Sequence, residues 1–67
     1  MNRPKARSVL SLRSQLAILK KINEACEHFM DCVENDELTI EAESKIVDLV
    51  LEGLYGSKVH TWIEENS

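Results

Sequence analysis

Apolar residues recur along residues 12–33 at alternating spacings of four and three positions. Because an α-helix has 3.6 residues per turn, side chains at these spacings lie along one side of a helix. The pattern therefore predicts one long helix from about Ser11 to Glu34. We call the repeating positions the heptad stripe; its members are Leu12, Leu16, Leu19, Asn23, Cys26, Met30 and Val33.

Two further apolar residues, Ile22 and Phe29, lie beside the heptad stripe and widen its apolar face. We expect charged and polar residues to occupy the other side of the helix: Lys20, Lys21, Glu24, Glu27, His28 and Asp31. Asn23 interrupts the stripe at a core position. A single buried Asn at such a position can fix register and oligomeric state. The alternative is that Asn23 reaches water where the core is thin.

A second helix is expected from about Ile40 to Tyr55. It follows a polar stretch, residues 35–39, in which Thr39 is suited to cap the helix N-terminus. Residues 47–54 are apolar on most sides of this helix. One antiparallel neighbour in the same chain would cover only one stripe of such a helix, so the pattern favours an oligomer or a stable partner.

A short third helix is expected from Lys58 to Glu65. Gly56 suits the backbone conformation that ends the preceding helix, and Ser57 is a candidate cap for the next one. The apolar side of this segment includes Trp62, which we expect to be a core or interface anchor because burying one large ring stabilises a small fold considerably.

These elements predict an all-α fold, an antiparallel helical hairpin with a short C-terminal helix folded across its end. With 67 residues the chain forms one domain, and a core of that size rarely supplies more than about 3–5 kcal/mol. We therefore expect a homodimer that forms a small helical bundle. Residues 1–8 are predicted to be a flexible basic arm and residues 9–67 a single helical domain. The segment from Val9 to Arg13 fits either a short strand or the first turn of the helix.

The charge is divided along the chain. Residues 1–23 hold six basic residues and no acid, whereas residues 24–67 hold twelve acids and two lysines. Such asymmetry fits a basic arm that contacts nucleic acid or an acidic protein. It fits equally a hairpin or antiparallel dimer in which the basic end lies over the acidic half of the same protein.

The two cysteines do not suggest a disulfide framework. Cys26 and Cys32 are six positions apart, so on one helix they point in different directions. We expect free thiols, with Cys26 buried as a small hydrophobe, and hence a reducing, cytoplasmic setting. The sequence has no apolar run long enough to span a membrane and no secretory signal pattern.

Residues that could carry catalysis are sparse. The sequence contains no phosphate-binding loop, nucleophile elbow or Cys-x-x-Cys pair. Glu24, His28 and Cys32 share a helical face, but a structural zinc site needs four ligands, and a charged, solvated face explains the same residues. We predict no enzyme, catalytic residue, metal, cofactor or small-molecule substrate.

The predicted function is a non-enzymatic protein–protein interaction module, a small regulator, inhibitor or adaptor acting through its helical surface. Besides a second copy, we expect the partner to be a larger protein. The expected dimer or partner interface comprises Leu16, Leu19, Asn23, Cys26, Met30, Val47, Val50, Leu51, Leu54 and Trp62.

The alternative function is that of a small dimeric DNA-binding regulator. One version is ribbon-helix-helix-like, with residues 7–13 as a strand in the major groove. Another is a C-terminal helix-turn-helix in which Gly53 opens the turn, and Ser57, Lys58, His60 and Thr61 face the groove. The candidate contacts to nucleic acid, or to an acidic partner, are Arg3, Lys5, Arg7, Arg13, Lys20 and Lys21.

Overall fold

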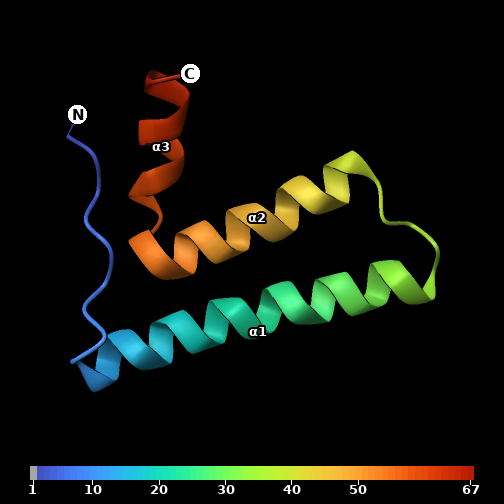
Figure 1. Cartoon of the computed structure of the whole chain (residues 1–67), viewed down its shortest axis with the longest axis horizontal. Coiled ribbons are helices and arrows are strands. Elements are labelled where there is room, and N and C mark those ends of the chain that lie inside the picture. Colours follow the sequence, from blue (N-terminus) through green and yellow to red (C-terminus); the bar gives the residue numbers. More distant parts are fainter. Residues whose placement is uncertain (1) are drawn as a thin grey trace.

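Three helices account for most of residues 2–67, the part of the chain that the computed structural model describes (Figure 1). They are α1 (Leu12–Glu34), α2 (Ile40–Tyr55) and α3 (Lys58–Glu65). No strand occurs among the described residues. The predicted all-α fold, with a helical hairpin and a short C-terminal helix, is confirmed.

Helix α1 begins where a serine can cap it. Ser11 has an extended backbone, and its hydroxyl oxygen accepts a hydrogen bond from the Ser14 N–H at 3.4 Å. The preceding residues Val9 and Leu10 form a turn, so the segment left open by the sequence is a turn followed by the start of the helix. The helix ends at Glu34, with Asn35 as its C-cap residue, and Asp36 then adopts a positive φ of 54° that directs the chain into the loop.

Helix α2 is capped as the sequence predicts. The Thr39 hydroxyl accepts a hydrogen bond from the Ala42 N–H at 3.1 Å. At the other end Gly56 has a φ of 87°, a conformation that favours glycine. The prediction that Ser57 caps α3 is wrong: its backbone is already helical, and its side chain makes no capping hydrogen bond.

Helices α1 and α2 run side by side in opposite directions (Figure 1). Their contact uses small residues. Ala25 and Cys32 are buried on α1, and Gly53 is buried on α2 beside Lys21. The absence of a side chain at Gly53 allows the two helix backbones to approach closely where they meet.

Helix α3 packs against α2 and makes no close backbone approach to α1. We had expected it to fold across the end of the hairpin, but Figure 1 shows α3 turning away from α1 at the C-terminal end of α2. Val59 is its buried residue. Only Gly56 and Ser57 connect α2 to α3, so α3 begins beside the C-terminal end of α2.

The molecule is one helix thick. Its extents are 37 × 31 × 11 Å, and a helix with its side chains is about 10–12 Å across. Within residues 2–67 the buried apolar residues are Ala25, Cys32 and Val59, and no large side chain is fully buried. The cysteines reverse our expectation, since Cys26 is exposed and Cys32 is the buried thiol. A single layer of helices therefore leaves most of its large apolar side chains in contact with solvent.

Candidate interaction surface

The heptad stripe of α1 lies on the surface of the chain. Its five large apolar members are between 50% and 69% exposed: Leu12, Leu16, Leu19, Met30 and Val33. Asn23 and Cys26 are exposed as well. The stripe runs the length of α1, about 34 Å at 1.5 Å per residue. The residues that the sequence pattern marks as a core are thus uncovered in the single chain.

The stripe is exposed because α2 packs against a different side of α1. The Lys21 side chain and the Ile18 carbonyl lie against Gly53, and Ala25 and Cys32 are buried. Residues 18, 21, 25 and 32 are offset by about 100° or more around the helix from their neighbours in the stripe. Lys21 belongs to the set that we had assigned to the polar side, and α2 covers it.

An apolar groove adjoins the stripe between α1 and α2. Its volume is about 300 Å³, and every residue that lines it is apolar: Ile22, Ala25, Cys26, Phe29, Met30, Ile46 and Val50. Cys26 and Met30 belong to both the groove and the heptad stripe. A second hollow, which includes Leu38 and Val47, continues from Phe29 and Ile46 toward the interhelical loop. Stripe and groove together form one continuous apolar surface.

The predicted interface residues of α2 and α3 fall into two groups in the structure, those that line the apolar groove and its continuation and those that do not. Val50 lines the groove, and Val47, which is 55% exposed, lines its continuation. Leu51, Leu54 and Trp62 are half-buried. The residues that the structure brings together with the stripe are therefore Val47 and Val50.

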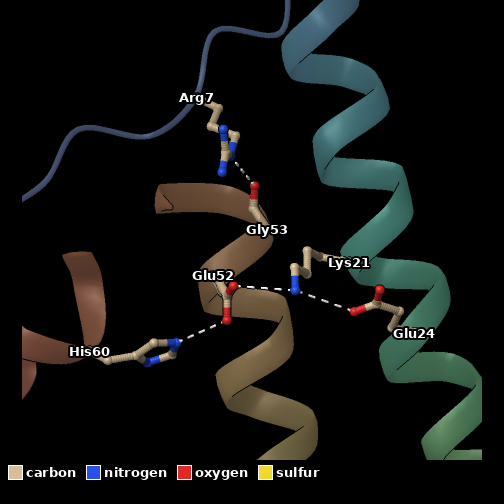
Figure 2. Close-up of polar contacts among 6 residues, drawn as sticks. All are labelled: Arg7, Lys21, Glu24, Glu52, Gly53 and His60. Atoms are coloured by element: carbon tan, nitrogen blue, oxygen red, sulfur yellow. Dashed lines mark hydrogen bonds and ion pairs between the residues drawn. The ribbon is translucent and has the colours of Figure 1, made fainter. Parts of the chain in front are cut away.

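Glu52 joins the three helices through polar contacts (Figure 2). One carboxylate oxygen lies 3.2 Å from Lys21 Nζ of α1, and the other lies 3.4 Å from His60 Nε2 of α3. Lys21 Nζ also lies 3.4 Å from a carboxylate oxygen of Glu24. These contacts lie away from the apolar groove and tie the helices together.

The ion pairs shift the ionisation of two of these groups. The hydrogen bond from Lys21 lowers the pKa of Glu52, with a further contribution from His60. The hydrogen bonds to Glu52 and Glu24 raise the pKa of Lys21. Each shift favours the charged form, as expected when an opposite charge lies within hydrogen-bonding distance.

Arg7 fastens the N-terminal segment to the end of α2. Its Nε donates a hydrogen bond to the Gly53 carbonyl at 2.9 Å (Figure 2). Its backbone N–H donates a hydrogen bond to the Leu54 carbonyl at 2.7 Å. The last carbonyls of a helix lack partners within that helix, so a cation there is favourable. Sequence reasoning missed this contact and the Glu52 contacts; the glycine within an apolar helix was the available sign of a close approach there.

The predicted basic contacts fall into two groups. Arg7 and Lys21 are engaged within the chain, as described above. The other four are exposed: Arg3, Lys5, Arg13 and Lys20. Of the residues predicted to face a DNA groove from α3, His60 is turned toward Glu52.

Other chemistry has little support in the described part of the chain. His28 Nε2 lies 3.8 Å from Cys32 Sγ, whereas Glu24 pairs with Lys21. Across residues 2–67, no group of three or more His, Cys, Asp or Glu side chains is placed to hold a metal ion. None of the described helices combines the length and hydropathy needed to cross a membrane.

Comparison with known proteins found no matching family model, no matching curated protein and no matching solved structure.

Proposed function

We propose that this chain is a non-enzymatic protein–protein interaction module whose binding surface is the heptad stripe together with the adjoining groove. The observation that carries the proposal is the exposure of Leu16, Leu19 and Met30, each more than half accessible on one face of one helix. Contiguous apolar surfaces of this kind mark interaction sites on soluble proteins.

Energetics support the same conclusion. Fully burying one large aliphatic side chain contributes roughly 1.5–3 kcal/mol. The single chain obtains little of this, because its buried apolar residues in the described part are the small or medium Ala25, Cys32 and Val59. A partner that covers the stripe would supply the missing burial.

In this proposal the chain works as a small regulator, inhibitor or adaptor, with either a second copy or a larger protein over the stripe. The two free thiols are compatible with a reducing compartment, and we propose a cytoplasmic location. DNA binding is the alternative. It is less favoured, because Val9 and Leu10 form a turn where a reading strand would lie, and Arg7 is held by α2.

Site-specific photo-crosslinking tests the proposal. A photoreactive amino acid placed at Leu19 should form a covalent adduct with whatever protein covers the stripe, either purified chain or a partner in an extract of the source cells. The matched control places the same group at Lys45, an exposed position of α2 outside the groove lining. Equal or absent crosslinking at the two positions would contradict the proposal.

A further inference from the structure

We propose that the occupant of the heptad stripe is a second copy of this chain, with the two α1 helices packed antiparallel. This inference rests on the proposed function and identifies the partner and its orientation. The evidence is a repeat of charges that runs beside the stripe and changes sign halfway along the helix.

The charged residues are Arg13, Lys20, Glu27 and Glu34, spaced by seven. Each directly follows a stripe residue, so all four occupy the same edge of the stripe. In heptad notation this is the e position, one of the two positions at which charges set partner choice and orientation. All four side chains are exposed.

The order of the charges selects the orientation. When two copies of α1 run antiparallel, e positions of one helix face e positions of the other. Arg13 then lies opposite Glu34 of the second copy, and Lys20 lies opposite Glu27. The twofold axis repeats both contacts, so that four ion pairs form and no like charges meet. Within residues 2–67, Arg13, Lys20 and Glu34 make no ion pair, so their charges are free for these contacts.

The same register aligns the stripe. It places large apolar residues opposite large apolar residues and keeps the polar ones at the centre. The paired positions are Leu16 with Val33, Leu19 with Met30, and Asn23 with Cys26.

The central asparagine disfavours other registers. Sliding one helix by a heptad would place Asn23 against Leu19 or Val33 of the other copy, where its amide would be buried without a partner at a cost of about 1–3 kcal/mol. In the single chain Asn23 Nδ2 lies 3.5 Å from Glu27 Oε1, which positions the amide on the side of the stripe that carries the charges.

The opposite edge of the stripe is apolar. It holds Ile22 and Phe29, which also line the groove against Ile46 and Val50. In the antiparallel arrangement Ile22 of one copy faces Phe29 of the other. The dimer interface therefore extends from the ion pairs, across the stripe, into the groove, and covers the apolar surface that the single chain leaves exposed.

Charge reversal at the e positions tests the arrangement by analytical ultracentrifugation. Glu27→Lys with Glu34→Lys changes the formal net charge from −4 to 0, which reduces general repulsion between copies. The antiparallel arrangement nevertheless predicts dimerisation weaker by about tenfold or more, because four attractive contacts become repulsive. Adding Arg13→Glu and Lys20→Glu restores opposite charges at every contact, returns the net charge to −4 and should recover the wild-type dimer.

Helix content measured by circular dichroism checks that these exposed substitutions leave the fold intact. A wild-type dimer that is unchanged or strengthened by Glu27→Lys with Glu34→Lys would overturn the antiparallel arrangement. A wild-type chain that stays monomeric at millimolar concentration would overturn the second copy as occupant. If the chain is monomeric, crosslinking from position 19 to another protein would still support the proposed function. The absence of any such crosslinking would overturn the proposed function as well as the dimer.

Discussion

A β-carbon at Gly53 would lie 2.8 Å from the β-carbon of Lys21, closer than two such atoms approach in proteins. The α1–α2 hairpin therefore depends on a glycine at this position. The β-carbon added at Gly53 would also lie 3.5 Å from the Ile18 carbonyl oxygen, an ordinary van der Waals contact with the backbone of α1. This close approach puts α2 on the side of α1 away from the heptad stripe.

Gly53→Ala should destabilise the hairpin, although helix propensity alone predicts the opposite. Alanine in a helix interior is favoured over glycine by roughly 1 kcal/mol. Crowding against the Lys21 β-carbon should cost about 1–3 kcal/mol, since neither that atom nor the α1 backbone can rotate away. Urea unfolding measures the balance. Stabilisation by the full propensity gain would show that the helices are not in close contact at this point.

Thr39→Ala should destabilise the chain by about 1 kcal/mol, because it removes the hydroxyl that caps α2. Ser57→Ala is the matched control. Ser57 precedes α3 in the same way, but its side chain makes no capping hydrogen bond, so its loss should have a much smaller effect. Thermal unfolding of both variants distinguishes them, and equal losses would argue against the caps as described.

Arg7→Ala should reduce stability by about 0.5–1.5 kcal/mol through loss of the hydrogen bond to the Gly53 carbonyl. It should also speed amide hydrogen exchange at the C-terminal end of α2. Lys5→Ala is the control, since Lys5 is exposed in the same segment. If the two variants behave alike, Arg7 does not anchor the N-terminal segment.

Stability should fall in acid partly through Glu52. Its pKa is lower in the folded chain than its ordinary value of 4.5, because Lys21 and then His60 donate to the carboxylate. The stabilisation is therefore present above that ordinary pKa and is lost as the pH falls through the folded value. Glu52→Gln should show a smaller loss of stability between pH 5 and pH 3, in solutions matched for salt.

The ion pair between Lys21 and Glu52 should also make the stability of the chain fall at high pH. The raised pKa of Lys21 means that its contribution is present below its ordinary pKa of 10.5 and is lost as the pH rises through the higher folded value. Parallel pH profiles for wild type and Glu52→Gln at both extremes would contradict the Lys21–Glu52 ion pair.

The helices were predictable from the sequence because their signals are local. Thr39 and Gly56 cap α2 as expected, and the bounds of all three helices agree closely with the predicted ones. The sequence does not show which face of α1 packs against α2. Because Lys21 interrupts the face that α2 covers, the sequence pattern predicts a solvated face there, although the aliphatic stem of a lysine can pack while its ammonium reaches an acid.

The sequence pattern predicts Leu16, Leu19 and Met30 as interface residues, and the structure leaves all three exposed in the single chain. Their coverage by a partner stays a prediction. Hydrophobic periodicity identified Leu19 and Met30 as core positions, but it cannot say whether a core lies within a chain or between chains. Small residues decided the matter here: Ala25, Cys32 and Gly53 allow a tight hairpin on a face with few large apolar side chains, which leaves the stripe outside.

The central claim, that a second copy of the chain covers the heptad stripe, is tested most directly by Leu19→Ala in equilibrium unfolding at several protein concentrations. Leu19 is 63% exposed in the single chain, so truncating it there should change stability little. If the stripe is buried between copies, the variant should lose about 2–5 kcal/mol, and wild-type stability should rise with concentration. A wild-type stability that is independent of concentration, together with an unchanged unfolding midpoint for Leu19→Ala, would contradict the account.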